Sequence, residues 1–472
     1  MKTSEKRGEI GQMYLQEGEE WTGIVPILAG SAVSYAQRRL VDECEIGREE
    51  EIALTTNLME VITSIENLVQ ALKRVKSNKG AAGVDGMTTK ELREWFNNNW
   101  RNLQKELLKG TYQVEAIRGV KIPKPKGGYR QLGIPTVKDR LVQQAIHQVL
   151  EKLYDRDFSP TSYGFRKGRS ASQAIKQLSH YIGQGNTYVI DIDLSKFFDE
   201  VNHNRLLNRL SQRIRDKRLL KLIHNYLKTG MLENGLISQR IKGTPQGSPL
   251  SPLLSNIVLD ELDRELSERG HKYVRYADDI IIVVGSQSSA ERVNASIINF
   301  IEDRMKLKVN IEKSRLCRPL DLNYLGHSFG KDGSIYLSKE SEERLKNKIR
   351  AVTKRNRGRS LEQIITELNL LLRGWLHYFR NAKMKRKMRI IESWLQRRLR
   401  CYRLKQCKRP IGIMRFLYKL GIPKKRAWTT AISRKGWWRK ALTPASHEGM
   451  NNRWFEDIGL YSLTKNYSLL QT

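Results

Sequence analysis

The spacing of apolar residues changes along the chain between a helical period and strict alternation. From Asn57 to Val75 the apolar positions follow an amphipathic helical pattern, which the glycine-containing run 79–83 ends. Residues 114–122 and 129–134 alternate, with Gly127 and Gly128 between them, and this predicts a hairpin. The same reasoning predicts helices at 138–154, 171–184 and 250–268, a buried strand at 187–193, and a strand–turn–strand unit at 272–284.

Beyond Leu337 the pattern is helical throughout. It includes a helix at 361–379 and breaks at Pro410 and Pro423. Strands are therefore expected only in the middle of the chain. The expected domains are a leader to which we assign no role (1–56), a region of strands and helices (57–335), a helical region (336–425) and a short basic, tryptophan-containing region (426–472).

The composition predicts a polyanionic partner. The 472 residues carry 85 Lys and Arg against 50 Asp and Glu, a formal net charge of +35. Such a surface attracts phosphate backbones and releases their counterions. No apolar run reaches the roughly 18 residues that a bilayer span needs, so we expect no membrane partner. The four cysteines show neither a CxxC pair nor zinc-ligand spacing, which fits a reducing cytoplasm.

The positive charge is concentrated late in the chain. Residues 1–60 hold 6 basic and 12 acidic side chains, whereas residues 341–440 hold 31 basic and 5 acidic ones. Charges on a helix usually form its solvated face, but here few acids balance them, and tryptophans are interleaved with them. That composition is typical of a nucleic-acid surface. The candidate RNA-binding residues are Arg386, Arg389, Arg397, Arg398, Arg400, Arg403 and Lys405.

Carboxylates lie at the ends of two predicted strands. Asp278 and Asp279 fall in the turn of the apolar unit at 272–284, and Asp191 and Asp193 end the strand before it. A lone Asp-Asp pair is usually a solvated turn. Two acidic strand ends together offer the hard oxygen ligands that phosphoryl transfer by two Mg²⁺ ions requires. Alternation puts Asp191 and Asp193 on one face, so the pattern alone does not choose between them.

Two further segments suit a nucleotide. The Gly/Pro-rich loop 243–252 opens a helix, where backbone comes close to a ligand, although an ordinary helix start has the same composition. Arg118, Lys124 and Arg130 are among the basic residues of the predicted hairpin. They suit the binding of a triphosphate, although a solvated edge strand is also basic.

The ordered motifs of the chain resemble those of group II intron reverse transcriptase/maturases. The resemblance extends from about residue 57 to residue 465, and several blocks occur in the family order. The blocks are residues 79–86, 130–136 and 162–166, Asp193 with 197–199, residues 245–247, the Tyr-Ala-Asp-Asp turn at 276–279, and residues 325–327.

The resemblance implies an α+β fold: a right-hand polymerase of fingers and palm, followed by an all-helical thumb or maturase domain. It implies an RNA-directed DNA polymerase with two Mg²⁺ ions, in which Asp193, Asp278 and Asp279 are the catalytic, metal-binding carboxylates. Asp191 is then a neighbour. Phe198 would be the aromatic gate that favours deoxynucleotides, and Lys313 would assist the leaving pyrophosphate, although a plain surface lysine is the alternative. The nucleotide-binding set is Arg118, Lys124, Arg130, Phe198, Gln246, Gly247 and Lys313.

The partners implied are group II intron RNA, an RNA template with a DNA primer, target DNA and dNTPs. These partners imply that the protein is located in a bacterial cytoplasm and that it contacts the nucleoid when it acts on DNA. No His-Asn-His or cysteine-pair block follows the basic region, which resembles the lineages without an endonuclease domain. Two alternatives stay open: a non-catalytic RNA-binding splicing factor, and a host-adapted reverse transcriptase in DNA repair or phage defence.

Overall fold

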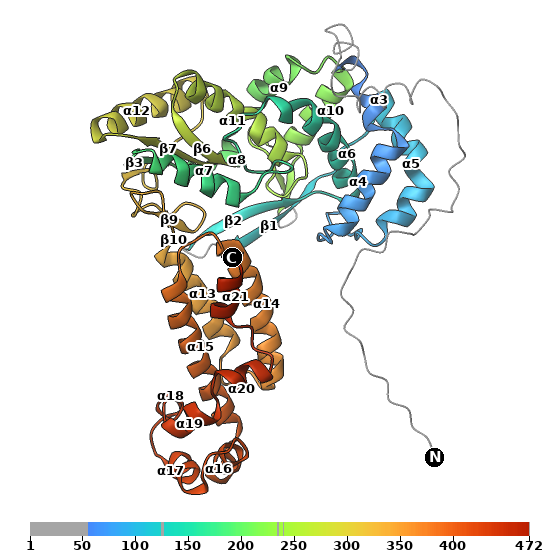
Figure 1. The fold of residues 1–472 in the computed structure, drawn as a ribbon. Helices are drawn as coiled ribbons and strands as arrows, with labels where there is room; N and C mark the ends of the chain where they lie inside the picture. Colours follow the sequence, from blue (N-terminus) through green and yellow to red (C-terminus); the bar gives the residue numbers. More distant parts are fainter. Residues whose placement is uncertain (1–54, 124–126, 234–235, 239, 472) are drawn as a thin grey trace, which may run out of the picture.

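The computed structural model describes residues 55–123, 127–233, 236–238 and 240–471. The predicted leader lies almost wholly outside these residues, and so does Lys124. Strands and helices are mixed in residues 55–337, which we call the mixed part, and residues 338–471, the helical part, contain helices alone. In Figure 1 the helical part projects from the end of the mixed part where β9 (His327–Phe329) and β10 (Ile335–Leu337) lie. The expected α+β class is confirmed.

The central sheet of the mixed part has the strand order β6-β7-β3-β8. Its strands are β3 (Tyr188–Ile192), β6 (Lys272–Tyr276), β7 (Asp279–Val284) and β8 (Arg315–Cys317). All neighbouring strands are antiparallel, and β3 lies between β7 and β8. One face of the sheet, with Ile190 and Ile280, joins the largest hydrophobic core, and the other, with Val189 and Ile281, joins a smaller core. The predicted strands 187–193 and 272–284 are confirmed.

A second sheet has the order β2-β1-β4-β5. The predicted hairpin forms it with two short strands; the bounds are β1 (Ile117–Pro123), β2 (Tyr129–Ile134), β4 (Met231–Glu233) and β5 (Leu236–Ser238). Arg118 pairs with Ile134 and Ile122 pairs with Arg130. Because side chains alternate between faces, Arg118 and Arg130 lie on the same face of the hairpin.

Helices pack against the central sheet. Those of the mixed part are α3 (Leu58–Ile62), α4 (Ile65–Ser77), α5 (Leu92–Lys109), α6 (Val137–Tyr154), α7 (Ala171–Gly183), α8 (Phe197–Glu200), α9 (His203–Ser211), α10 (Lys217–Lys228), α11 (Ser251–Glu268) and α12 (Gln287–Asn299). The predicted helices at 138–154, 171–184 and 250–268 are confirmed as α6, α7 and α11. The single helix predicted from Asn57 to Val75 is wrong, because Ser64 accepts a hydrogen bond from the Asn67 backbone and starts a new helix there.

The helical part runs outward along one long helix and returns. Its helices are α13 (Lys339–Val352), α14 (Leu361–Phe379), α15 (Lys385–Gln406), α16 (Pro410–Lys419), α17 (Lys424–Ile432), α18 (Trp437–Lys440), α19 (Pro444–Gly449), α20 (Asn452–Asp457) and α21 (Leu463–Leu469). In Figure 1, α16 and α17 form the far tip and α21 lies back beside α14. Leu368, Leu395 and Tyr467 share one hydrophobic core, so the core continues across the domain limit predicted at residue 425.

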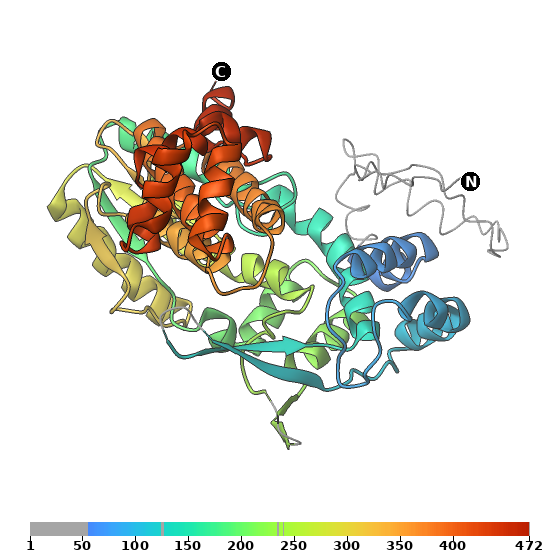
Figure 2. The same cartoon turned by 90° about the horizontal axis from the view of Figure 1, so that it is seen from below.

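The helices α3, α4 and α5 lie at a distance from the helical part (Figure 2). In the view of Figure 2 the helical part overlies the sheet side of the mixed part, and α3–α5 lie at the opposite end. Among the described residues, none of the helices combines the length and the apolar character that crossing a bilayer requires.

Candidate active site and nucleic-acid interface

The predicted carboxylates meet at one end of the central sheet. Asp191 pairs with Ile281 across β3 and β7, and Asp279 follows Tyr276 through the two-residue turn. The register therefore places Asp191 and Asp279 on the same face, and Asp193 comes just after β3 ends. Lys313 Nζ lies 3.1 Å from Asp193 Oδ2, and Arg315 Nε lies 3.3 Å from Asp191 Oδ2. Asp193 and Asp191 are thus each paired with a cation of their own.

The carboxylates of these acids repel one another, and each therefore affects the pKa of its neighbours. Burial of the carboxyl group, with the charges of Asp278, Asp191 and Asp193, raises the pKa of Asp279 to about 7. Burial also raises the pKa of Asp278, and Asp193 adds to that effect, whereas Arg130 and Lys313 oppose it. A carboxyl group with a pKa near neutral pH is about half protonated there. A bound cation favours its charged form and would therefore ionise it.

The acids suit Mg²⁺ in their chemistry. Within the described part of the chain, no three His, Cys, Asp or Glu side chains form a ready-made metal-binding group. Mg²⁺ commonly takes one or two carboxylates and completes its shell with water and substrate phosphates, so such a cage is not required. The oxygens of Asp193 and Asp278, which repel one another across the strand end, fit an ion completed in this way.

A buried arginine holds the turn that carries Asp278. Ala277 has a positive φ of 59°, which costs energy in a residue with a side chain. Arg275 Nη1 donates to Ala277 O at 2.9 Å and to Asn256 Oδ1 at 2.9 Å, and Arg275 Nε donates to Asp263 Oδ1 at 2.8 Å. The side chains of Arg275 and Asp263 are both 0% exposed.

Gly164 presses against the same turn from the other side. A Cβ at this position would lie 2.1 Å from Ala277 N, and Gly164 O accepts a hydrogen bond from Asn256 Nδ2 at 2.9 Å. The sequence argument missed Arg275, Asp263 and Asn256. The available signals were an arginine between Val274 and Tyr276 in a strand expected to be buried and the Ser-Tyr-Gly-Phe-Arg segment at 162–166, whose backbone the structure places against β6 and the turn.

The Gly/Pro-rich loop joins the hairpin to Phe198. Gly247 has a φ of +116°, and a Cβ there would lie 2.7 Å from Gly133 O, while Gly133 N donates to Gln246 O at 2.8 Å. At the other end of the loop, Thr244 N donates to Phe198 O at 2.6 Å. The structure therefore brings Phe198, Gln246 and Gly247 into one assembly.

The predicted basic residues of the hairpin are only partly gathered at the acids. Arg130 is close enough to lower the pKa of Asp278. Arg118 shares its face of the hairpin but donates from Nη1 to Ala82 O at 3.3 Å. Lys124 lies outside the described residues.

The predicted RNA-binding residues of α15 fall into two groups. Arg386, Arg389 and Lys405 are exposed. Three others support neighbouring residues: Arg397 lies 3.9 Å from the centroid of the Trp438 ring, Arg403 lies 4.2 Å from that of Phe416, and Arg398 Nε donates to Thr353 Oγ1 at 2.7 Å.

Arg400 requires a correction. It is 3% exposed, its Nε donates to Met450 O at 2.9 Å, and it lies 5.3 Å from the centroid of the Phe455 ring. Burial lowers the pKa of Arg400 to about 10. The prediction that this residue binds RNA is therefore wrong, because the returning chain covers it.

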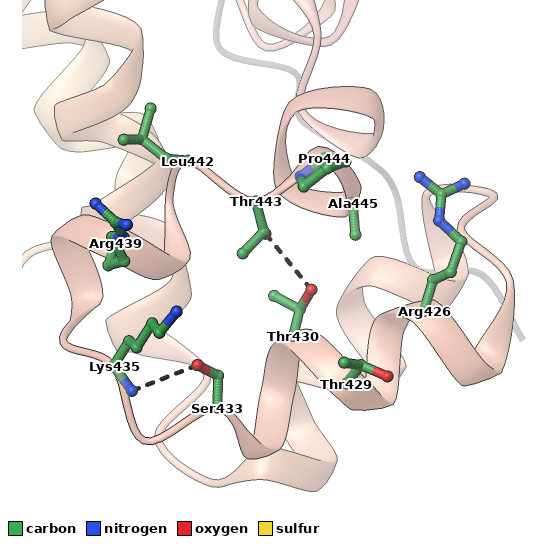
Figure 3. A pocket seen from close by; sticks show the side chains of 10 residues that line it. All are labelled: Arg426, Thr429, Thr430, Ser433, Lys435, Arg439, Leu442, Thr443, Pro444 and Ala445. Atoms are coloured by element: carbon green, nitrogen blue, oxygen red, sulfur yellow. Dashed lines mark hydrogen bonds between the residues drawn. The ribbon is translucent and has the colours of Figure 1, made fainter.

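Two basic pockets flank α18. One, of about 750 Å³, is drawn in Figure 3, where Arg426 faces Lys435 and Arg439 across a floor rich in hydroxyl groups. Arg426 also pairs with Glu448 at 2.6 Å. The other pocket, of about 500 Å³, includes Trp438 and Arg398 in its wall. The tip of the helical part thus carries concave, positively charged surface.

Two family models match this chain, one on each part. Residues 122–329 match the reverse transcriptase (RNA-dependent DNA polymerase) model, and residues 342–419 match the group II intron, maturase-specific domain. The first match contains the acid turn and the loop at 243–252, and the second contains α14 and α15.

Individual relatives each align with more than half of this chain. Protein YkfC of Escherichia coli K12 is 34% identical over 320 residues, which cover 59% of this chain and 84% of YkfC. The putative COX1/OXI3 intron 2 protein of Saccharomyces cerevisiae is 29% identical over 321 residues, covering 55% of this chain and 37% of that protein. The group II intron-encoded protein LtrA of Lactococcus lactis subsp. cremoris is 30% identical over 309 residues, covering 52% and 51%. The chain belongs to the group II intron reverse transcriptases, RNA-directed DNA polymerases that carry a maturase-specific domain.

Proposed function

We propose that the protein copies group II intron RNA into cDNA by two-metal nucleotidyl transfer, and that its helical part binds the same RNA to promote splicing and mobility. The observation that carries the polymerase proposal is the meeting of Asp193, Asp278 and Asp279 at one sheet end. The maturase proposal rests on the matched domain and on the exposed cations of α15.

Asp193 and Asp278 hold the metals in this proposal, and Asp279 supports them. Two bound Mg²⁺ ions supply an activated primer hydroxyl and charge stabilisation on the leaving pyrophosphate. Asp279, with its pKa near 7, would be about half protonated at neutral pH and would ionise fully beside a bound cation. Mg²⁺ binding is therefore expected to release protons at neutral pH.

The other residues position the nucleotide. Gln246 and Gly247 present the loop backbone to the incoming dNTP, and the Phe198 ring excludes a 2′-hydroxyl. Arg130 neutralises the triphosphate at the hairpin side of the acids, and Arg118 and Lys124 complete the basic set proposed for it. Lys313 Nζ lies 3.1 Å from Asp193 Oδ2, and it would be available to the pyrophosphate oxygens if a metal took that carboxylate. The four cations of the set, Arg118, Lys124, Arg130 and Lys313, have the charge that suits a triphosphate.

The helical part takes the long nucleic acid. Exposed Arg386, Arg389 and Lys405 contact RNA phosphates, and the basic tip around Arg426, Lys435 and Arg439 contacts target DNA. In this proposal residues 57–335 form the polymerase, residues 336–425 bind the RNA and residues 426–472 contact the DNA. Because one hydrophobic core extends past residue 425, the last two regions fold as one unit.

The variant Asp278→Ala tests the polymerase. Primer extension on an RNA template with dNTPs and Mg²⁺ should fall at least about a hundred-fold, the loss typical when one preorganised electrostatic group leaves an active site. Retention of intron RNA on a filter should not change, because the RNA contacts lie on the helical part. Asp303→Ala, an exposed aspartate of the mixed part, is the matched control and should extend primers normally.

Two results would contradict the proposal. Full extension by Asp278→Ala would remove this carboxylate from the chemistry. Intron binding and splicing by a wild-type protein that extends no primer would favour the non-catalytic splicing factor instead.

A further inference from the structure

The second basic pocket of the helical part is built for an anion. It has a volume of about 500 Å³ and lies between the loop after α13, the C-terminal half of α15, and α18. Four of its lining residues are cations and none carries a carboxylate; the lining residues are Thr353, Lys354, Arg355, Asn356, Arg398, Cys401, Lys405 and Trp438. Arg357 and Arg359, the later arginines of the loop after α13, do not line the pocket and pair with Glu367 of α14.

The cations of the pocket are held in place without neutralisation. Arg398 Nε donates to Thr353 Oγ1 at 2.7 Å, and Arg355 Nη1 lies 3.7 Å from Cys401 Sγ. Burial lowers the pKa of Arg398, and the charges of Arg350 and Arg355 lower it further. These positive charges repel one another. Binding of an anion is therefore energetically favourable, because it relieves that repulsion.

One wall of the pocket is an aromatic ring fixed from behind. Arg397 lies 3.9 Å from the centroid of the Trp438 ring, and Arg397 Nη2 donates to Trp438 O at 3.1 Å. Arg397 does not line the pocket, so it covers the ring from outside while Trp438 remains 39% exposed. A ring supported in this way is a stacking platform for a base.

We propose that this pocket binds one unpaired nucleotide of a bound RNA, with its base against Trp438 and its phosphate held by Lys354, Arg355 and Lys405. The inference rests on the proposed RNA binding by the helical part and names the structure that it recognises. An unpaired nucleotide is required because a base inside a duplex has both faces stacked and does not reach a pocket wall. The pocket of Figure 3 is the weaker candidate, because Glu448 already pairs with its Arg426 and no aromatic ring lines it.

The test compares three ligands on the full chain. The ligands are a short single-stranded RNA, the same RNA in a duplex, and an abasic sugar–phosphate strand of equal length. Trp438→Ala should weaken binding of the single-stranded RNA about ten-fold, the value of one lost stacking contact. Its binding of the duplex and of the abasic strand should not change, and Trp438→Phe should restore most of the affinity.

Control variants separate the ring from the cations. Trp428→Ala removes a similarly exposed tryptophan, 42% against 39%, that does not line the pocket, and it should bind all three ligands normally. Lys405→Gln should weaken the single-stranded RNA and the abasic strand alike. It should also reduce the slope of log affinity against log salt by about 0.7, as for one lost phosphate contact on a single strand.

The outcomes separate this inference from the function on which it rests. If the wild-type protein does not bind RNA, the proposed role of the helical part is wrong. If it binds RNA but Trp438→Ala weakens all three ligands equally, or Trp428→Ala has the same effect, the nucleotide pocket is wrong and general RNA binding stands. A misfolded Trp438→Ala protein would lose the abasic strand as well; Trp438→Phe and Lys405→Gln then decide.

Discussion

Arg275 is a cation buried without any exposure, and its charge is balanced by one equally buried partner, Asp263. Burying such a pair brings little net stability, because the desolvation cost offsets the attraction. Its contact with Ala277 O gives a reason for its presence. A guanidinium is planar and donates in fixed directions, so it sets the position of the strained turn before Asp278 better than an apolar residue would.

We therefore expect the stability and the activity of Arg275 variants to separate. Arg275→Met leaves the Asp263 carboxylate buried and uncompensated and should cost about 3–5 kcal/mol of stability. The double variant Arg275→Met, Asp263→Leu should recover most of that stability. Its primer extension should stay low and need more Mg²⁺, because Ala277 O still lacks its donor.

Thermal unfolding and Mg²⁺ titrations of primer extension measure the two effects. Arg269→Met, which removes a surface arginine paired with Glu265, is the control and should alter neither. Recovery of extension and of the ordinary Mg²⁺ requirement in the double variant would reduce Arg275 to a plain core ion pair.

The sequence revealed some of these residues and hid others for physical reasons. Asp278 and Asp279 stand out because adjacent acids in an apolar hairpin are costly. Arg275, three residues before Asp278, resembles the exposed side of a strand, and only its contact with Asp263 of the preceding helix α11 shows that it is buried. Arg400 was misjudged in the same way, because Met450 and Phe455 cover it from a later segment.

At the scale of elements, the loop at 243–248 connects two surfaces of the nucleotide site. It bonds to β2 through Gly133 and to the segment of Phe198 through Thr244. Both bonds are made by the backbone path of the loop, and Ser251 Oγ, which donates to Pro245 O at 2.8 Å, also holds it in place. The left-handed conformation of Gly247 is the point at which this path turns.

Gly247→Ala should therefore disturb catalysis more than folding. The φ of +116° and the approach to Gly133 O cost about 1–3 kcal/mol of local strain. Relief of that strain moves the loop away from β2, so primer extension should fall roughly ten-fold, mainly through a higher KM for dNTP.

Steady-state extension with varied dNTP measures this effect. Gly285→Ala lies in the mixed part with open space around its added Cβ and should extend primers normally. An unchanged KM in Gly247→Ala would show that the loop tolerates a side chain and does not set the nucleotide site.

Strands and helices in the mixed part were predictable because each has its own apolar period and turn residues. The break at Ser64 was not, because a serine in an amphipathic pattern is equally consistent with a solvated helix position. It acts as an N-cap because Ile62 and Leu68 are packed into one core from two directions.

At the scale of the whole molecule, the late helices complete the helical part. Tyr467 of α21 is 5% exposed; its hydroxyl donates to Ala382 O at 2.8 Å and accepts from Met384 N at 3.1 Å. Both partners lie in the turn between α14 and α15. The sequence pattern predicted these helices but not this return, because short apolar segments after residue 440 give no indication of where they pack.

Tyr467→Phe should destabilise the helical part by about 1–3 kcal/mol, since it leaves a buried N–H and a buried carbonyl without partners. The helical transition in calorimetry of the full chain should move to lower temperature, while the transition of the mixed part should not. Tyr418→Phe changes a tyrosine that is 60% exposed and is the control. Equal midpoints for wild type and Tyr467→Phe would contradict a structural role for this hydroxyl.

The return of α21 also sets the order in which the protein is made. The basic helix α15 leaves the ribosome before the segment with Tyr467 is translated, so its apolar face waits for a partner while its arginines are already exposed beside ribosomal RNA. The fingers and palm have no such delay, because their core residues are all synthesised before Leu337. Slow translation after α15 would therefore prolong a state in which an apolar helix face is exposed and the net charge is strongly positive. An RNA held early by α15 would meet a helical part that is still assembling.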